Sequence, residues 1–274
     1  MDLVDDLQRI VSLTSFPQRI VSLVPSITET LFALGAGARV VGVTDYCTHP
    51  PDGVARITKL GGTKNPQLEA ILQLTPELVI LNDEENRRED FLWLDAQGLP
   101  VYVTAPRTVA DGIAMIDRLG TLLGCQDRSA PVTQDLRELY KQSEEALTGQ
   151  PRLRVFCPIW RKPWMSFNRD TYVDDMLWCC GGENVERERS ERYFTVTLEE
   201  VAALSPQVVL LPSEPYPFTT KHFSHLQPLA HTPAGQAGHV YCVDGMALCW
   251  YGPRIADGLK QLSTLFAYVR TTID

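Results

Sequence analysis

The chain has 274 residues, a formal net charge of −9, and a composition of 44% hydrophobic and 22% charged residues. This composition is typical of a globular protein with one large or two medium domains. The acidic balance argues against binding to nucleic acid or to anionic lipid, because both need a basic surface, and no stretch approaches the roughly 20 apolar residues of a membrane span.

The N-terminal residues MDLVDDLQRIVSLTSF do not look like a secretory signal. They lack a basic start, a long apolar core and a small-residue cleavage site. The seven cysteines are odd in number and show no metal-cluster spacing, which is typical of buried thiols in a reducing compartment. Taken literally, these features predict a cytoplasmic protein. A periplasmic or cell-surface protein from which a signal had been removed is the alternative.

The first part of the chain alternates strand and helix patterns. Strands are expected at residues 19–24, 40–43, 78–81 and 101–103. The first helix is expected to begin in a capping box of Ser26 and Glu29 and to end at Gly35. A second is expected to start at Asn65 and Pro66, and a third covers residues 91–98. Strands that alternate with helices predict a mainly parallel sheet.

Two helices without a strand between them are expected in the middle of the chain. The first covers residues 109–124, and the second covers residues 132–147 after the break CQDRSAP. At about 1.5 Å per residue the second helix spans roughly 24 Å, which predicts a strut between two lobes. We therefore expect an N-terminal α/β lobe at residues 1–107, connecting helices at 108–150 and a C-terminal α/β lobe at 151–274.

The last part of the chain repeats the pattern of the first. Strands are expected at residues 153–159, 208–211 and 240–243, and helices at 171–180, 198–204 and 223–229. A final helix should open near Pro253. Thr197 and Glu200 form the pattern of a capping box.

One phrase occurs twice without a gap. LEAILQLTPELVIL covers residues 68–81, and LEEVAALSPQVVLL covers residues 198–211. Each copy predicts a short helix, a Pro that ends it and a strand buried on both faces. Glu69 and Glu199 occupy the second position and should point into solvent, away from the apolar stripe. The length of the match favours two related lobes.

The order of several motifs resembles the cobalamin-binding and iron-siderophore-binding proteins of ABC importers, and is closest to the cobalamin-binding branch. The motifs are RIVSLVPSITETLFALGAGARVVGVTDYC, LGGTKNPQLEAILQLTPELVIL, WRKPWMSFNRDTY, LLPSEPYPF and WYGPR. The resemblance implies two Rossmann-like α/β lobes with mainly parallel sheets, joined by a rigid backbone helix. It also implies a solute-binding protein that captures a large ring or metal chelate between its lobes for ABC import.

The resemblance implies that Glu69 and Glu199 dock onto a permease, one from each lobe. The alternative is that acidic residues in a first helical turn suit the helix dipole. The binding site should lie where strand ends and helix starts of both lobes face one another. The candidate ligand-binding residues are Pro25, Ser26, Tyr46, His49, Lys64, Asn65, Trp160, Trp164, Phe167, Tyr172, Glu214, Tyr216, Phe218, Trp250 and Arg254. The aromatic members suit the flat conjugated ring of a corrin or porphyrin.

Enzyme classes are disfavoured by the motifs. Ser26 lacks the setting of a hydrolase nucleophile, GAGARVVG follows a helix where a dinucleotide loop must precede one, and no P-loop is present. His222 and His225, with His231 nearby, are weak evidence for a metal site. We therefore expect neither a catalytic cofactor nor a metal centre, and a monomeric carrier.

Cobalamin is the first candidate ligand. A ferric siderophore or haem is the alternative, and an anionic chelate of this kind would need cations, for which Lys64, Arg161, Lys162 and Arg254 are the candidates. A second class of function is a cytoplasmic protein that handles or senses a chelate without a permease.

Overall fold

The computed structural model describes residues 1–273 and separates them into two compact lobes. The first lobe contains Met1–Pro106, Asp111–Asp135 and Tyr251–Pro253. The second contains Arg107–Ala110, Leu136–Trp250 and the chain from Arg254 onward. Two short segments thus differ from their sequence neighbours. Residues 107–110 belong to the second lobe, and residues 251–253 belong to the first.

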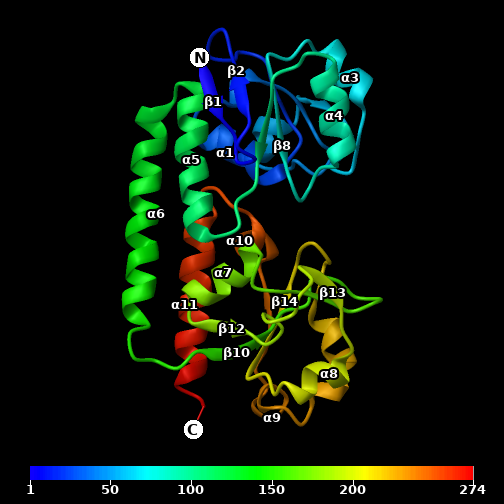
Figure 1. The fold of residues 1–274 in the computed structure, drawn as a ribbon. Coiled ribbons are helices and arrows are strands. Elements are labelled where there is room, and N and C mark those ends of the chain that lie inside the picture. Colours follow the sequence, from blue (N-terminus) through cyan, green and yellow to red (C-terminus); the bar gives the residue numbers. More distant parts are fainter. Residues whose placement is uncertain (274) are drawn as a thin grey trace. The chain divides into compact units, whose positions relative to one another are not determined.

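The first lobe is built on a five-stranded parallel sheet in the order β5-β4-β3-β8-β9. Its strands are β3 (Ile20–Ser22), β4 (Val40–Val43), β5 (Thr58–Lys59), β8 (Leu78–Asn82) and β9 (Val101–Thr104). Its helices are α1 (Pro25–Ala33), η1 (Gly37–Arg39), α2 (Pro51–Val54), α3 (Leu68–Gln73), α4 (Arg88–Ala96) and most of α5 (Val109–Leu123). Figure 1 shows α3 and α4 on the side of β8 opposite to α5.

The second lobe has a four-stranded parallel sheet in the order β12-β10-β14-β15. Its strands are β10 (Leu153–Phe156), β12 (Gly182–Asn184), β14 (Val208–Pro212) and β15 (Val240–Val243). β11 (Met165–Phe167) and β13 (Tyr193–Thr195) form a separate antiparallel pair. The helices are α7 (Tyr172–Cys179), α8 (Leu198–Ala203), η2 (Thr220–Leu229), α9 (Pro233–Ala237), α10 (Gly245–Cys249) and α11 (Ile255–Arg270). The predicted fold class of two mainly parallel α/β lobes is confirmed.

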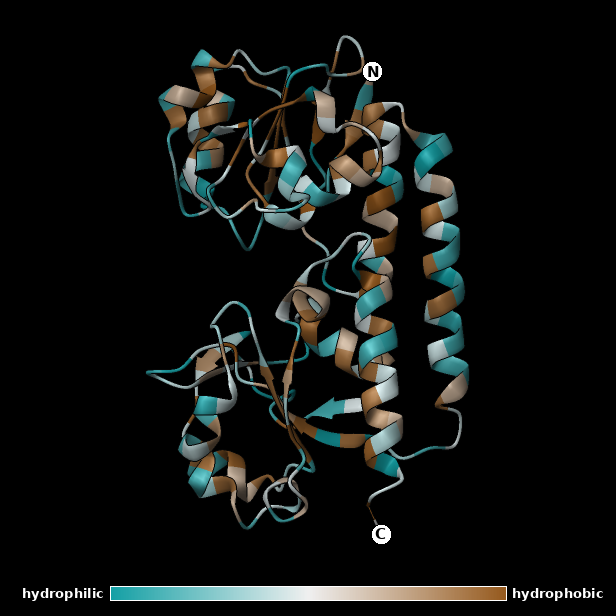
Figure 2. Ribbon diagram, turned by 180° about the vertical axis from the view of Figure 1, so that it is seen from behind, coloured by the Kyte–Doolittle hydropathy of each residue, from teal (hydrophilic) through white to brown (hydrophobic). Residues whose placement is uncertain are grey.

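The two copies of the repeated phrase adopt the same structure. In the first lobe Val79 and Leu81 of β8 pack with Ile71 of α3 in one apolar cluster. In the second lobe the residues 130 positions later, Val209, Leu211 and Val201, share another. Figure 2 shows brown, hydrophobic strands within each sheet, as expected for strands covered on both faces, whereas β12 is largely hydrophilic.

In each copy of the repeated phrase, an arginine side chain binds a carbonyl group at the C-terminal end of the helix. The Nε and Nη2 atoms of Arg19 donate to the Leu74 carbonyl at 3.1 and 2.6 Å. Those of Arg154 donate to the Leu204 carbonyl at the same two distances. The next residue has a left-handed backbone in both copies, with φ of 44° at Thr75 and 50° at Ser205. This turn exposes a carbonyl at the negative end of the helix, where a cation is favoured.

Three expected helix starts differ from the structure. Pro25 is the first residue of α1, which has no side-chain cap, so the predicted capping box of Ser26 and Glu29 is wrong. Asn65 and Pro66 form β7, which pairs with β6 (Gly61–Gly62), and α3 begins only after Gln67. The hairpin forms because Gly61 adopts a φ of 82°. The capping box of Thr197 and Glu200 is confirmed, and Gly35 ends α1 with a φ of 74°.

The third difference concerns α6 (Gln126–Ala146), which is one helix that includes most of the expected break. Pro131 lies inside it. Pro131 and Asp127 are exposed, so water can bind the carbonyl that a proline amide leaves without a partner. The helix belongs to the first lobe up to Asp135 and to the second from Leu136. Within residues 1–273, no helix combines the length and apolarity needed to cross a membrane.

The N-terminal residues fold as part of the first lobe. β1 (Asp2–Val4) and β2 (Ile10–Ser12) form an antiparallel hairpin. The N-terminal ammonium group donates to the Leu13 carbonyl at 2.7 Å. The Asp6 carboxylate pairs with Arg118 at 2.8 Å and accepts from the Ala105 amide at 2.7 Å. The acidic composition of this segment therefore reflects the contacts that it makes in the lobe.

The matched arginines give a test of the duplicated unit. We expect Arg19→Met and Arg154→Met each to lower the free energy of unfolding by roughly 1 to 2 kcal/mol, because each removes two charged hydrogen bonds to a helix-end carbonyl. Urea unfolding measures this loss, and Arg56→Met, at an exposed position of the first lobe, is the control. Equal stability of all three variants would show that the arginine is not needed at the helix end.

Candidate functional site

Aromatic rings cluster at one end of the second lobe. Trp160 and Met165 lie at the two ends of a tight turn, and their backbones pair in an antiparallel bridge. Its ring meets Tyr216 edge-on, with 5.4 Å between ring centroids. Tyr216 contacts Phe218 at 4.6 Å, and Phe218 stacks on Trp164 at 5.8 Å. Phe218 is buried and fixes the cluster in the core, whereas Trp160 is 44% exposed and presents its indole ring to solvent.

Two histidines extend this aromatic cluster along η2. The His222 ring contacts Tyr216 and Phe218 edge-on, at 5.5 and 5.4 Å. Its Nδ1 atom accepts from the Thr219 amide at 3.0 Å, which leaves Nε2 facing the Tyr216 hydroxyl at 3.5 Å. His225 lies beyond it, with 5.7 Å between the two rings. Desolvation lowers the pKa of His225, helped by the positive charge of Arg161.

A carboxylate and a guanidinium lie near the start of α10. The Glu214 carboxylate accepts a hydrogen bond from the Trp250 side chain. The Arg254 guanidinium lies 5.2 Å from the Trp250 ring centroid. Burial raises the pKa of Glu214, and the Asp244 carboxylate adds to the rise, while Trp250 and Arg254 oppose it. Trp250 is buried, so its main contacts are with the protein.

Two of the predicted ligand-binding residues are part of the core. Phe167 is 0% exposed and Tyr172 is 4% exposed, so neither offers a surface to a ligand. Burial raises the pKa of Tyr172 well above its ordinary value. We correct the prediction for these two residues, because Phe167 ends β11, Tyr172 begins α7, and both pack inward. Three other predicted residues, Ser26, Phe218 and Trp250, are also buried, at 2%, 3% and 7% exposed.

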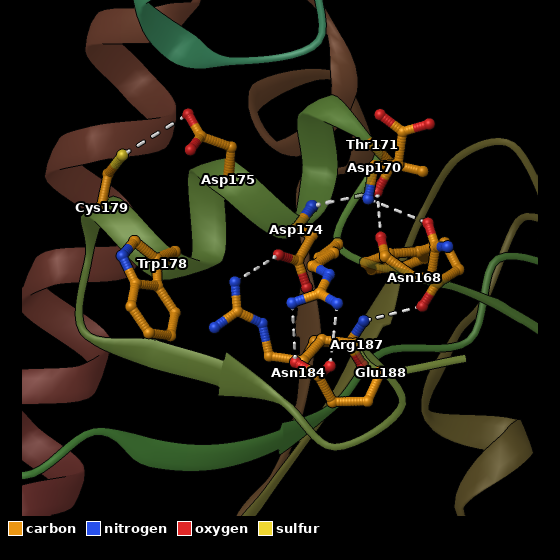
Figure 3. Close-up of polar contacts among 12 residues, drawn as sticks. Asn168, Asp170, Thr171, Asp174, Asp175, Trp178, Cys179, Asn184, Arg187 and Glu188 are labelled. Carbon is orange, nitrogen blue, oxygen red and sulfur yellow. Dashed lines mark hydrogen bonds and ion pairs between the residues drawn. The ribbon is translucent and has the colours of Figure 1, made fainter. Parts of the chain in front are cut away.

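Polar contacts hold this core segment in place (Figure 3). Asn184 donates to the Phe167 carbonyl at 2.7 Å, and Thr171 caps α7 by accepting from the Asp174 amide. Arg187 pairs with Asp174 at 3.3 Å. The guanidinium groups of Arg187 and Arg152 lie 3.8 and 3.5 Å from the Trp178 ring centroid. The loop that follows the aromatic cluster is therefore fixed by structural contacts.

The predicted residues of the first lobe lie at the carboxyl ends of its strands. Pro25 and Ser26 are buried at the start of α1. Tyr46 follows β4 and is 64% exposed. His49 is half-buried, and its Nδ1 atom contacts the Thr48 hydroxyl at 3.0 Å.

The β6–β7 hairpin carries the other two predicted residues of this lobe, Lys64 and Asn65, both exposed. The Lys64 ammonium donates to the Glu84 carbonyl at 2.5 Å. A side chain at Gly62 would meet Asn65 and approach the Tyr46 ring. Tyr46, Lys64 and Asn65 therefore form one exposed surface.

Sequence reasoning missed the residues that brace this surface. Asn86 donates to the carbonyls of Leu23 and Thr63 at 3.1 and 2.9 Å and so ties the hairpin to β3. The Tyr251 hydroxyl donates to Glu85 at 3.4 Å. Asn82 and Asn86 follow a buried strand, which is a signal for a functional loop at the end of a parallel sheet. Tyr251 belongs to the first lobe, although its sequence neighbours Trp250 and Arg254 belong to the second.

Glu69 and Glu199 are both exposed in the first turn of a six-residue helix, as predicted. Glu199 takes no part in the capping box of α8, which uses Glu200. α3 has no side-chain cap at all. Capping therefore does not explain the acidic residue that the two copies share.

The described residues contain no group of three or more His, Cys, Asp or Glu side chains placed to hold a metal ion. His222 and His225 remain a pair in this part of the chain. All seven cysteines are free thiols, of which Cys47, Cys157, Cys179 and Cys180 are buried. Burial raises the pKa of the Cys47 thiol, which keeps it protonated and unreactive.

Comparison with known proteins identifies the family. Residues 20–246 match the family described as "Periplasmic binding protein". A vitamin B12-binding protein of Vibrio parahaemolyticus is 25% identical over 205 residues, which cover 75% of this chain and 71% of the relative. A vitamin B12-binding protein of Vibrio cholerae is 24% identical over 255 residues, 91% of this chain and 89% of the relative.

Solved structures agree with this assignment. The periplasmic haem-binding protein of Roseiflexus sp. RS-1 has a TM-score of 0.80 and 26% identity, covering 92% of this chain and 98% of its own. The periplasmic vitamin B12 binding protein of Vibrio cholerae has a TM-score of 0.82 and 21% identity, covering 93% and 98%, which shows the shared fold. The chain belongs to the periplasmic binding protein family, whose members are solute-binding proteins of ABC importers.

This result overturns the expected cytoplasmic location. The family is one of periplasmic proteins, and so are the two structural relatives. The two signals behind the expectation are explained by the fold. The acidic N-terminal residues form a hairpin of the first lobe, and four of the seven thiols are buried, where they need no partner.

The partly buried carboxylate of Glu214 predicts a pH dependence. Its pKa is raised in the folded protein, so its stabilising contribution is present below the ordinary glutamate pKa of about 4.3 and is lost as the pH rises through the folded value. We expect Glu214→Gln to become more stable relative to the wild type as the pH rises from about 4 to 7. Urea unfolding across this range measures the difference, and a constant or falling difference would contradict the assignment.

Proposed function

We propose that this periplasmic binding protein carries a corrinoid of the cobalamin type and that the exposed ring of Trp160 is the main contact of its second lobe. The single observation that carries the proposal is the aromatic cluster, in which an exposed indole is braced by Tyr216 above a buried Phe218. Two curated relatives are named vitamin B12-binding proteins. The relatives are binding proteins, and we propose a carrier role without catalysis.

The geometry of Trp160 suits a large conjugated ring. The Trp160 and Tyr216 rings are nearly perpendicular, at 78°, and Trp160 stays 44% exposed, so ring surface remains on which a flat ligand can stack with offset geometry. The bracing also means that little side-chain entropy is lost when the ligand binds. In the first lobe the exposed Tyr46 offers a second aromatic surface, beside Lys64 and Asn65.

Haem is the second candidate, and a specific observation favours it. Haem iron needs a ligand from the protein, and a neutral imidazole serves. His225 is exposed beside the aromatic cluster, and its lowered pKa favours the neutral form. A structural relative with 26% identity binds haem. Calorimetry with cobalamin and with haem, and the visible spectrum of the haem mixture with wild type and with His225→Ala, separate the two ligands.

We also propose that Glu69 and Glu199 dock the protein onto the two subunits of an ABC permease. The two residues occupy the same position in duplicated helices, both are exposed, and capping explains neither. An exposed carboxylate contributes little to folding beyond its favourable position in the field of the helix dipole, and both residues lie in a first helical turn. Docking onto basic residues supplies a further reason for the matched positions, because complementary charges speed and orient association.

Trp160→Ala should weaken cobalamin binding by roughly 1 to 3 kcal/mol, because it removes an exposed ring face and no core contact. Calorimetry measures the affinity, and unfolding by urea checks that stability is retained. Trp250→Ala is the matched control, because Trp250 is buried and its loss should lower stability first. Unchanged affinity in a folded Trp160 variant would show that the site is misplaced.

Glu69→Ala and Glu199→Ala should leave stability and ligand affinity nearly unchanged while lowering capture by the permease. The double variant should lose more capture than either single variant, together with its dependence on salt, because exposed charge pairs act through screened attraction. Co-sedimentation with permease vesicles at two salt concentrations measures this. Glu200→Ala is the control, since its contacts are those of a helix cap. A double variant captured as well as the wild type would refute the docking role.

A further inference from the structure

The first lobe contains a pocket that includes none of the residues proposed for ligand binding or docking. It encloses about 320 Å³ between the N-terminal hairpin, the carboxyl end of β8 and the first turns of α4. It is lined by Leu7, Arg9, Leu81, Asn82, Asp83, Asn86, Arg87, Arg88, Phe91, Leu92 and Val103. Small-molecule sites range from about 300 to 1,000 Å³, so the pocket suits a ligand of amino-acid size and not a macrocycle.

Two exposed leucines on ordered elements line the opening of the pocket. Leu7 is 46% exposed and Leu92 is 49% exposed, on the hairpin loop and on α4 respectively. The loop cannot collapse freely, because the Asp5 carboxylate accepts from the amides of Leu7 and Arg9 at 3.0 and 2.9 Å. The Asp6 amide also donates to the Val103 carbonyl at 3.1 Å. An apolar mouth fixed in this way remains available to an apolar group.

Most polar side chains that line the pocket already form hydrogen bonds or ion pairs within the protein. The Asn82 side chain donates to Thr104 and accepts from the amides of Glu84 and Glu85. Asn86 accepts from the Asn82 amide. Arg9 pairs with Asp5 and lies 4.1 Å from the Phe91 ring centroid, and Arg87 pairs with Asp90 at 3.2 Å.

Arg88 is the exception. It is the first residue of α4, it is exposed, and no ion pair or hydrogen bond of its side chain is found within residues 1–273. α4 has no side-chain cap, so the positive end of its dipole adds to the charge of Arg88. Of the three arginines that line the pocket, Arg9 and Arg87 are paired with carboxylates, so Arg88 is the cation left to bind an anion.

We propose that this pocket is a second binding site, for a small apolar carboxylate. The Arg88 guanidinium binds the carboxylate through its planar pair of donors. Leu7, Phe91 and Leu92 contact the apolar body over a floor of buried Leu81 and Val103. The pocket shares no proposed contact residue with the large ligand, although Asn86 of its lining also braces the hairpin that carries Lys64 and Asn65.

Methyl NMR of the full chain labelled at leucine tests the proposal, with phenylacetate as the probe. We expect saturable shifts of the Leu7 and Leu92 methyl signals. Uncharged phenylacetamide and cationic phenethylamine should bind about tenfold more weakly or worse, because they cannot pair with a guanidinium. The experiment needs no other ligand, so its failure leaves the proposed carrier function untouched.

Two variants separate anion recognition from apolar contact. Arg88→Gln should weaken phenylacetate about tenfold, while Arg56→Gln, an exposed arginine of the same lobe outside the pocket, should leave it unchanged. Leu92→Trp should block the mouth and abolish the shift at Leu7. Both substituted residues are exposed, so folding should survive. The proposal is overturned if phenylacetamide binds as well as phenylacetate, if Arg88→Gln matches the wild type, or if only leucines outside the pocket shift.

Discussion

Each lobe depends on how a short helix is joined to a strand that is buried on both faces. Such a strand must enter the sheet at a fixed point, because a slip of one residue would turn every side chain to the other face. Pro76 and Pro206 end the preceding helix, and an arginine from the neighbouring strand binds the carbonyl at that end. Backbone bonds complete the join: the Glu77 amide donates to the Arg19 carbonyl at 2.8 Å, and the Gln207 amide to that of Arg154 at 2.7 Å. Each join thereby fixes where β8 and β14 begin.

The ends of β8 and β14 are where the two lobes differ. After β8 the chain forms a loop held by asparagines, in which Asn82 and Asn86 satisfy backbone groups of their own loop and of the adjacent hairpin. After β14 it forms the segment that carries Glu214, Tyr216 and Phe218. The same scaffold thus presents a polar, braced surface in one lobe and an aromatic surface in the other. This is the usual division in parallel sheets, where the scaffold is shared and the loops carry function.

The sequence predicted the repeated units well, because apolar periodicity and proline act over a few neighbouring residues. It failed where distant groups decide. Ser26 and Glu29 have the spacing of a capping box, but Pro25 already begins the helix and Ser26 is buried. Thr197 and Glu200 have the same spacing at an exposed helix start, and there the box forms. Phe167 and Tyr172 were predicted for the site because they lie near a strand end and a helix start. Their burial depends on Asn184 and other residues far along the chain, whose position no local pattern reveals.

The exposed rings are the strongest structural argument for ligand binding. Folding gains nothing from the part of each ring that stays in water, which is 44% of Trp160 and 64% of Tyr46. Isolated apolar surface residues are ordinary, but Trp160 is held by ring contacts that continue through Tyr216 and Phe218 into the core. A side chain that is exposed and yet rigid keeps its apolar surface for a partner and loses little entropy on binding. In the first lobe, Asn65 and the Tyr46 ring both lie close to Gly62, so the exposed phenol has a polar neighbour.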